Sequence, residues 1–404
     1  MPSSLFALNA LNFFAADVRD GLGPFLGVFL QSKGWDPGEI GLVMTIGGLA
    51  GMVATTPLGA LVDRLQSKRL LLIVAAVAIV IASLVTLALP TFTAVAASQT
   101  FNGIAAAVVA PAIAGITLGL VKQKGFAHQM GRNEAFNHGG NVFAALLAGA
   151  LGYAFGFGAV FGVMAAMAIV AVVATWFIDP QEIDYRAARG LDEDTDETAA
   201  GFSVLLTCAP LVVLALTLLL FHLGNAAMLP LLGQAIAAHG GDPSAYTSAT
   251  IIVAQLTMVP MALVAAKIAE TRGYWLVFVL ALVALPIRGA IAAWVTGPAG
   301  LVPVQMLDGV GAGLLGVAVP GLAARILAGT GRINAGIGAV TTVQGIGASL
   351  SPSLAGYVAQ TLGYSAAFAV LGGVAALALG LWLAATGIVA DACRKSPAPE
   401  ASKA

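Results

Sequence analysis

The chain has 404 residues, a net charge of −1 and a composition unlike that of a soluble domain. Charged residues make up 9% of it, against roughly 25% in soluble domains, and 59% of the residues are apolar. So little charge could not cover the surface of a soluble fold of this length, and the net charge gives no indication of a nucleic-acid partner. Two cysteines, Cys208 and Cys393, indicate neither a disulfide framework nor a metal site, so we expect no cofactor and no metal.

Twelve apolar runs are long enough to cross the hydrocarbon core of a bilayer. We expect helices, because a strand barrel would show alternating polarity instead of continuous apolar runs. The sequence therefore predicts an all-α integral membrane protein with twelve transmembrane helices. The runs lie near residues 5–31, 39–62, 69–89, 92–121, 132–155, 158–178, 203–232, 245–267, 274–296, 299–328, 334–360 and 364–390.

The first six runs and the last six repeat each other at an offset of 206 to 207 residues. A unit of six spans laid twice in the same direction is typical of two-bundle secondary transporters. We predict six-helix bundles over 1–178 and 203–393, a cytoplasmic linker over 179–202 and a disordered cytoplasmic tail over 394–404. The matching pairs are Pro24 with Pro230, Gln99 with Gln305, Gly103 with Gly309, Asp63 with Glu270, Gly149 with Gly356, Gly156 with Gly363, and Phe161 with Phe368.

Basic residues predict the orientation. An even number of spans puts both termini on one side, and 15 of the 18 Lys and Arg residues fall on that side. The positive-inside rule therefore predicts cytoplasmic termini in a bacterial-type plasma (inner) membrane. These basic residues are Arg64, Lys68, Arg69, Lys122, Lys124, Arg132, Arg186, Arg189, Lys267, Arg272, Arg325, Arg332, Arg394, Lys395 and Lys403.

A loop motif follows the second span and contains Gly59, Asp63, Arg64, Lys68 and Arg69. It resembles the loop signature of the major facilitator superfamily of secondary transporters. The resemblance implies the two-bundle fold of that superfamily and a conformational latch at this loop. In such a latch Gly59 lets two helices approach closely, and Asp63 pairs with a basic group or caps a helix N-terminus.

A degenerate copy of the motif, with Glu270 and Arg272, lies at the equivalent loop of the second half. Two other features of the superfamily's proton-driven drug exporters are absent. Gln99 stands where those exporters carry an Arg in the fourth span, and the fifth span has no proline. Both departures count against a standard multidrug exporter.

The first span carries Asp17, Arg19 and Asp20 near its middle. Each would cost roughly 2.5–3.5 kcal/mol if it faced lipid, so we expect them to face inward. On one continuous helix they share an arc of about 160° with Asn12 and Pro24, which we expect to line the central cavity.

This polar cluster has two interpretations. Arg19 is the best candidate to hold an anionic substrate group, because guanidinium forks match carboxylate or phosphate. Asp17 and Asp20 could bind a cationic group or carry a coupling proton. Alternatively, the cluster neutralises itself and only fixes helix packing.

Other candidates follow from their positions. Asp308 in the tenth span occupies the repeat position of Asn102 and is either a protonation site or a hydrogen-bonded interior carboxyl. His138 and Asn141 lie one turn apart in the fifth span, where His138 could shuttle protons or make a polar helix contact. Asn225 in the seventh span is the repeat partner of Arg19.

One further arginine lies inside a span. Arg288 in the ninth span is expected to snorkel to the outer interface.

The sequence thus predicts a secondary transporter that works by alternating access, and not an enzyme or a channel. No phosphate-binding loop is present, so we expect an ion gradient, that of protons, to supply the energy. Its partners would be a small-molecule substrate, protons and the lipid bilayer, and we expect a monomer. Export of a toxic or xenobiotic compound is the first expectation, and uptake or release of a small organic anion is the alternative.

Overall fold

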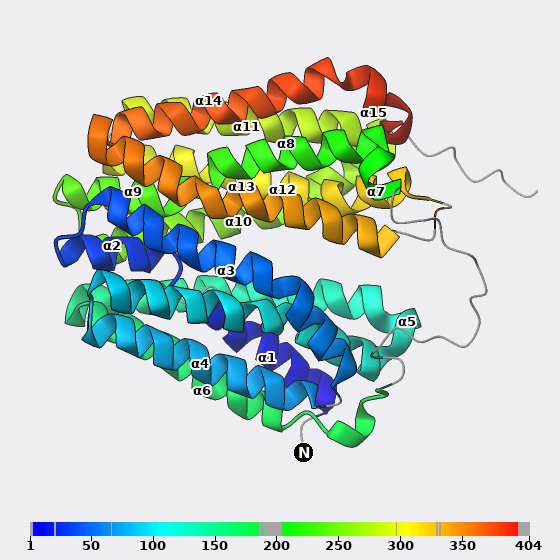
Figure 1. Ribbon diagram of the computed structural model, residues 1–404, viewed down its shortest axis with the longest axis horizontal. Coiled ribbons are helices and arrows are strands. Elements are labelled where there is room, and N and C mark those ends of the chain that lie inside the picture. Colours follow the sequence, from blue (N-terminus) through cyan, green and yellow to red (C-terminus); the bar gives the residue numbers. More distant parts are fainter. Residues whose placement is uncertain are drawn as a thin grey trace, which may run out of the picture. The chain divides into compact units, whose positions relative to one another are not determined.

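The computed structural model describes residues 3–19, 22–65, 67–185, 188, 204–295, 297–328, 330 and 333–394. Throughout these ranges the chain forms helices and short 3-10 turns and no strand (Figure 1). The all-α prediction is confirmed for this part of the chain. Most of the predicted linker, and the tail from residue 395, lie outside the described residues.

The helices of the first half follow the predicted spans, with two differences. The fourth and fifth spans form one long helix, α5, which Lys122 divides because its φ of 54° and ψ of −178° are not helical. The first span is not the single helix that we expected. The elements are α1 (Ser4–Arg19), α2 (Pro24–Ser32), α3 (Pro37–Arg64), α4 (Lys68–Ala88), α5 (Phe92–Phe155), α6 (Phe157–Trp176) and the 3-10 turn η1 (Pro180–Glu182).

The helices of the second half also follow the spans, and its first and last spans are divided. A short turn precedes the seventh span, and the twelfth span ends in a separate short helix. The elements are α7 (Val204–Thr207), α8 (Ala209–Asn225), α9 (Met228–Ala238), α10 (Pro243–Arg272), α11 (Tyr274–Trp294), the 3-10 turn η3 (Pro298–Gly300), α12 (Leu301–Ile326), α13 (Ile333–Leu362), α14 (Tyr364–Ala384) and α15 (Thr386–Cys393).

The first and seventh spans break at corresponding places. Gly23, with a φ of 46°, precedes Pro24 at the start of α2, and proline is favoured there because its missing N–H needs no partner in the first helical turn. In the second half α8 ends at Asn225, and α9 begins at Met228. Our expectation of one continuous helix over 5–31 was therefore wrong.

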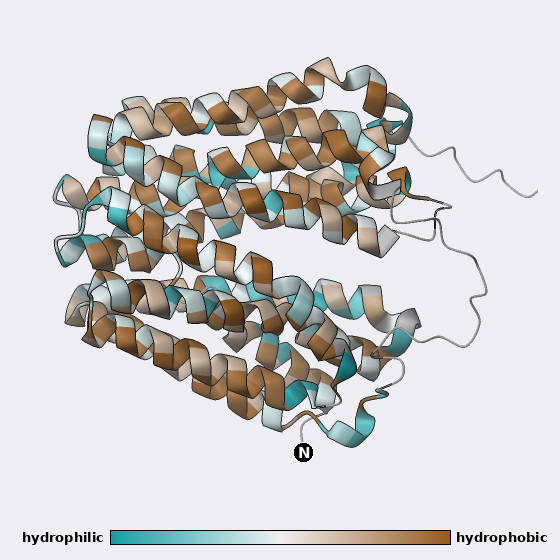
Figure 2. Ribbon diagram, viewed as in Figure 1, coloured by the Kyte–Doolittle hydropathy of each residue, from teal (hydrophilic) through white to brown (hydrophobic). Residues whose placement is uncertain are grey.

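Surface composition shows that these helices face lipid. Large apolar side chains of α4 are exposed at Leu70, Val74, Val77, Ile81 and Leu84, a spacing of three to four residues that puts them on one face. A soluble helix would bury such a stripe. Figure 2 shows hydrophobic residues along most of the helices.

Nine segments among the described residues are long and apolar enough to cross a membrane. The remaining spans of the predicted twelve are the first span, divided between α1 and α2, the second part of α5, and α13. The twelve-helix architecture therefore accounts for every long helix in the described part of the chain.

The chain divides into two compact units, and each is described here by itself. Unit 1 consists of Met1–Asp196, Leu229–Ile252 and Pro352–Thr361. Unit 2 consists of Glu197–Met228, Val253–Ser351 and Leu362–Ala404. Unit 1 thus contains the first-half helices together with α9, the start of α10 and the end of α13.

Repeat partners have matching backbone and packing roles. Gly156 (φ 79°, ψ −176°) precedes α6, and Gly363 (φ 88°, ψ 166°) precedes α14. In unit 1, a Cβ at Gly103 would collide with the Gly47 carbonyl, so the second and fourth spans meet backbone to backbone. Gly309 makes the equivalent contact in unit 2, against the carbonyl of Ala254 on α10.

Small residues allow close contacts of α5 with α10 and of α13 with α3 in unit 1. A Cβ at Gly149 on α5 would collide with the hydroxyl of Ser248 on α10. A Cβ at its repeat partner Gly356 on α13 would collide with the carbonyl of Pro37 on α3. The same duplicated glycine thus allows close helix contact at two places in unit 1.

Polar bonds join the same segments of unit 1. The Gln31 amide on α2 donates to the carbonyl of Gln234 on α9, 3.1 Å away. The hydroxyls of Thr45 on α3 and Ser353 on α13 are 2.8 Å apart, and the Ser353 N–H also donates to Thr45. These residues, with the glycine contacts, form what we call the seal of unit 1.

The two cysteines have different surroundings. Cys208 is partly exposed, whereas Cys393 at the end of α15 is buried. Burial raises the pKa of the Cys393 thiol to about 11, although the nearby Arg325 acts in the opposite direction. The Cys393 thiol is therefore protonated at neutral pH and slow to react.

The conformation of Gly363 gives a first prediction. Replacing it by Ala is expected to reduce the free energy of unfolding by about 1–3 kcal/mol, because only glycine adopts this backbone region without strain. Gly373→Ala in the middle of α14 is the control, since a Cβ at either position meets no atom within 4 Å. Thermal unfolding of both variants in detergent is the measurement. Equal losses in both would show that the backbone conformation of Gly363 is not the cause.

Candidate functional site

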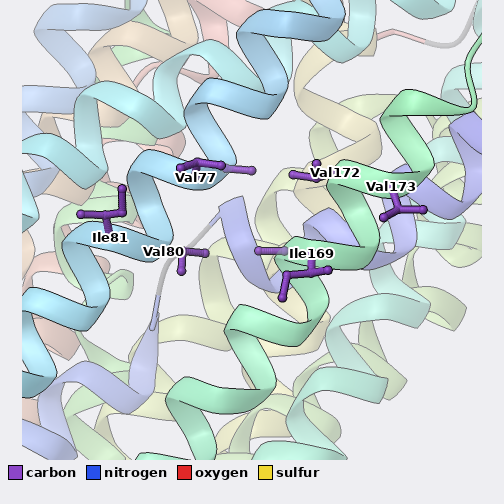
Figure 3. Close-up of a pocket in the computed structure, with 8 residues that line it drawn as sticks. Val77, Val80, Ile81, Ile169, Val172 and Val173 are labelled. Carbon is purple, nitrogen blue, oxygen red and sulfur yellow. The ribbon is translucent and has the colours of Figure 1, made fainter.

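The pocket drawn in Figure 3 has no polar lining. It lies between α4 and α6 and is lined only by aliphatic side chains, six of which are labelled there: Val77, Val80, Ile81, Ile169, Val172 and Val173. Several of these side chains belong to the exposed apolar surface. We therefore assign this groove to contact with lipid and look for the functional site among buried polar groups.

A buried ion pair lies inside unit 2. Arg288 on α11 has an exposed fraction of 0%, and its Nη1 is 2.9 Å from Oδ1 of Asp308 on α12. The same Nη1 donates to the side-chain oxygen of Asn225 on α8 over 2.5 Å. Nη2 donates more weakly to Gln305, one turn before Asp308, over 3.4 Å. Two helices, α8 and α12, thus direct polar groups at one guanidinium on a third helix, α11, and we call this group of residues the Arg288 cluster.

The position of Arg288 corrects a prediction. We expected its side chain to snorkel to the outer interface, but it is fully buried and paired with Asp308. An unpaired guanidinium in a hydrocarbon layer is strongly unfavourable, so a buried arginine requires a nearby carboxylate. The length of Arg288 made snorkelling plausible from sequence, and the pairing depends on a residue twenty positions further along the chain.

The Arg288 cluster is not fully satisfied. Arg288 Nε and Gln305 Nε2 are both buried donors with no hydrogen-bond acceptor among the described residues. The carboxylate of Asp308 is 11% exposed, so the pair is not completely enclosed. His222 on α8, one turn before Asn225, is close enough to Asp308 to interact electrostatically. Its Nδ1 lies 3.0 Å from the Leu218 carbonyl.

The first half has no counterpart of this pair. The helices α4 and α11 begin and end at repeat-equivalent residues, so Arg288 corresponds to Ala82. Asp308 corresponds to Asn102, whose Oδ1 is buried without a partner in the described structure. The fold therefore packs the equivalent spans of the first half without an ion pair at these positions.

The first half has instead a buried network of neutral side chains. The Gln129 amide on α5 donates to Asn9 on α1 over 2.9 Å and to Asn133 over 3.0 Å. The Asn133 amide donates to the Thr117 hydroxyl over 2.9 Å, and that hydroxyl donates to the Ile113 carbonyl over 2.7 Å. These bonds join the first, fourth and fifth spans, so the network fixes helix packing.

The predicted first-span cluster is described only in part. Asp17 is half-buried on α1, whereas Asp20 and the side chain of Arg19 lie outside the described residues. Asn12 is buried, and its amide donates to the Leu8 carbonyl over 2.9 Å. Because the helix is interrupted after α1, Pro24 does not continue the polar face that we predicted.

Among the other candidates, the structure brings Asn225 and Asp308 together around Arg288. His138 and Asn141 are both half-buried on α5 and do not belong to this cluster.

The loop motif binds helix ends. Lys68 is 1% exposed, and its Nζ donates to the Val62 carbonyl over 2.5 Å at the end of α3. Arg69 donates to the Thr175 and Trp176 carbonyls at the end of α6, over 3.0 and 2.7 Å. Cations at these carbonyls are favourable because helix C-termini carry partial negative charge.

The other parts of the predicted latch stay a prediction. A Cβ at Gly59 would meet no atom within 4 Å in the described structure. The side chain of Asp63 lies outside the described residues. Arg64, Glu270 and Arg272 are exposed.

Sequence reasoning missed Gln305, Gln129 and Thr117. Gln305 had a signal, because it matches Gln99 in the repeat and lies three residues before Asp308 on one helix face. No sequence signal marked Gln129 or Thr117. Their partners Asn9 and Asn133 lie on other spans, and no local pattern predicts how these spans pack.

Comparison with known proteins identifies the family. The model of the Major Facilitator Superfamily matches residues 5–335. Two relatives from Mycobacterium tuberculosis are each 44% identical over 387 residues, which cover 94% of this chain and 92% of theirs. They are the uncharacterized MFS-type transporters MT2531 (strain CDC 1551 / Oshkosh) and Rv2456c (strain ATCC 25618 / H37Rv). The chain therefore belongs to the Major Facilitator Superfamily of secondary transporters.

Solved structures show the same fold. A mutant of the nucleoside transporter NupG has a TM-score of 0.78 at 14% identity, covering 95% of this chain and 99% of its own. A bacterial homolog of the human lysosomal transporter Spinster, inward-facing and unoccupied, has a TM-score of 0.77 at 16% identity, covering 98% of both chains. At these identities the similarity concerns the fold alone. It confirms the predicted fold class.

The Arg288 cluster gives a stability prediction. Arg288→Gln leaves Asp308 without its cation and is expected to cost about 3–5 kcal/mol of stability. Adding Asp308→Asn removes the unpaired charge, so the double variant should be more stable than Arg288→Gln alone. Thermal unfolding at pH 7.5 is the measurement. The exposed pair Lys122–Asp184 provides the control, and its double neutral variant should change little. A double variant less stable than Arg288→Gln would contradict the pairing.

The neutral network gives a second prediction with a matched control. Thr117→Val removes the hydroxyl that accepts from Asn133 and should cost about 1–3 kcal/mol, because a buried amide donor is left unpaired. Thr55→Val is the control. Its hydroxyl also bonds a carbonyl one turn earlier, over 2.8 Å, but it is exposed. Thermal unfolding distinguishes the two, and similar values would mean that the network does not stabilise the fold.

Proposed function

We propose that this chain moves a small molecule across the bacterial plasma membrane by alternating access, and that Asp308 carries the coupling proton. The observation that carries the proposal is the Arg288–Asp308 pair, a carboxylate held inside the apolar spans of unit 2 by one buried cation. An ionisable group inside a membrane span is costly unless it is paired, and such groups commonly mark proton pathways.

Protonation of Asp308 changes the electrostatics of the whole cluster. While Asp308 is ionised, its charge compensates that of Arg288 across 2.9 Å. A neutral Asp308 leaves Arg288 with only the amide oxygens of Asn225 and Gln305. Two proton states of one carboxyl group therefore favour different arrangements of α8, α11 and α12, which is the requirement for coupling a proton to a conformational change.

The direction of transport has two candidates. Export of a toxic or xenobiotic compound is supported by the well-kept loop motif at Asp63 and Arg64 and by the few charges inside the spans. Transport of a small organic anion is supported by the buried Arg288, whose Nε has no acceptor in the described structure. Arg19, with Asp17 and Asp20, stays a second candidate for contact with the substrate or with protons.

The remaining parts of the proposal concern topology and the latch. The distribution of basic residues supports cytoplasmic termini and two six-helix bundles joined by the 179–202 linker. Asp63 and Arg64 in the first half, with Glu270 and Arg272 in the second, would act as the conformational latch.

Substrate-driven proton movement tests the coupling. Purified protein is first screened against diverse compounds by thermal shift at two pH values, and each hit is then added to proteoliposomes that contain a trapped pH dye. The unmodified protein should move protons when a hit is added, in a saturable manner. Asp308→Asn should exchange the hit between the two sides but move no protons, because the titrating group is gone.

The double neutral variant of Lys122 and Asp184, an exposed ion pair, provides the control and should move protons as the unmodified protein does. Substrate-driven proton movement that persists in Asp308→Asn would remove this carboxyl group from the coupling. Comparing vesicles of both orientations gives the direction of net transport.

A further inference from the structure

We infer that Arg288 binds a carboxylate group of the transported molecule in the place of Asp308, once Asp308 has taken up a proton. The inference rests on the proposed proton coupling at Asp308 and selects the organic anion among the two substrate candidates. Four observations carry it: the geometry of the cluster, its unsatisfied donors, its charge, and its absence from the first half.

In the described structure Arg288 has one charged partner, Asp308, whose place a substrate carboxylate could take. Nη1 of Arg288 contacts Asp308 and Asn225, and Nη2 contacts Gln305 over the longer distance of 3.4 Å. Asn225 and Gln305 are neutral, so among the described residues Asp308 alone balances the charge of the guanidinium. Asp308 is also partly exposed, whereas Arg288 is not. A ligand that reaches the cluster would therefore meet the carboxylate first and the guanidinium behind it.

The unsatisfied groups are donors. Arg288 Nε and Gln305 Nε2 are buried and find no acceptor among the described residues. A carboxylate has two oxygens and only accepts hydrogen bonds, so it can satisfy a guanidinium edge with two parallel bonds. A cationic or purely donating ligand would leave both donors unsatisfied. The cluster is thus chemically complementary to an anion.

Charge balance explains why proton and anion would bind together. In the empty cluster, Arg288 and the ionised Asp308 sum to zero. With Asp308 protonated and a substrate carboxylate on Arg288, the sum is again zero. An anion without the proton would give a net negative cluster, and a proton without the anion would leave a buried cation unpaired, and both are unfavourable inside a membrane. The cycle therefore carries one proton with each monoanion.

The absence of the pair from the first half argues against a purely structural role. Ala82 and Asn102 occupy the equivalent positions, and their helices pack with the same boundaries as α11 and α12. A pair needed only to hold these spans together would be needed in both halves. The equivalent helices of the first half therefore pack without such a pair.

Few other titratable groups face this cluster. His222 on α8 interacts with Asp308, and Arg288 comes from α11. The described parts of α13 and α14 contain no Asp, Glu, Lys, Arg or His. α10, which packs against Gly309, carries Lys267, Glu270 and Arg272 only in its last two turns. Among the described residues, Asp308 and His222 are thus the groups beside Arg288 that can bind a proton.

Matched pairs of probes test the inference. Benzoate, phenylacetate and indole-3-acetate are compared with their three amides by thermal shift of the purified protein at pH 5.5 and 7.5. We expect at least one carboxylate to bind, and its amide to bind at least tenfold more weakly. Binding should weaken by up to about tenfold per pH unit once Asp308 ionises, because one proton is taken up with the anion.

Three variants assign this behaviour to the cluster. Arg288→Gln should weaken carboxylate binding by about 10- to 100-fold, the loss expected for charge-assisted hydrogen bonds. Asp308→Asn should bind equally well at both pH values. His222→Gln should keep the pH dependence. If Arg288→Gln does not fold, Arg288→Gln with Asp308→Asn is used in its place, since it leaves no unpaired charge.

Several results would overturn the inference. One is that none of the three carboxylates binds, or that an amide binds as well as its carboxylate. Another is that the variants without Arg288 bind carboxylates as the unmodified protein does. A third is that the pH dependence is lost in His222→Gln. The proposed function fails separately, when no compound moves protons. If protons move with neutral or cationic compounds only, the proposed function holds and this inference does not.

Discussion

The constraint on which this structure depends is that hydrocarbon satisfies no polar group. Every backbone N–H and C=O within the spans must find its partner inside the protein, so the chain forms helices throughout its described part. The same constraint explains what the loop motif does with Lys68 and Arg69, which bind the free carbonyls at the ends of α3 and α6. It also makes any charge within a span informative, because no solvent compensates it.

The two halves share backbone conformations and helix contacts, and they differ in the polar side chains of their interiors. Repeat partners such as Gly156 and Gly363 kept one backbone conformation, and Gly103 and Gly309 kept one packing role. The polar interiors of the halves differ. The first half uses neutral amides and a hydroxyl around Asn133 to join its helices, whereas the second half holds the Arg288 cluster. The repeat is therefore visible in the backbone and in the helix contacts, but not in the buried polar and charged groups.

The sequence predicted the features that depend on local pattern. Apolar runs predicted the spans, and the repeat predicted which glycines would be equivalent. Prediction from sequence failed where the position of a side chain depends on a partner from another helix. Arg288 was expected to snorkel because its partner Asp308 lies on another helix. The polar face of the first span was derived for an unbroken helix, which the turn at Gly23 interrupts.

The seal of unit 1 has an energetic consequence. Its polar bonds, from Gln31 to Gln234 and between Thr45 and Ser353, join neutral amides and hydroxyls to one another or to a carbonyl. A bond from Gln360 to Asp36 over 3.5 Å involves a carboxylate. Water can replace each of these bonds at a net loss of about 0.5–1.5 kcal/mol, so breaking the polar bonds of the seal costs a few kcal/mol. A membrane voltage of about 100 mV supplies roughly 2.3 kcal/mol for each elementary charge that crosses. The free energy of breaking these polar bonds is therefore of the same order as that of moving one elementary charge across the membrane.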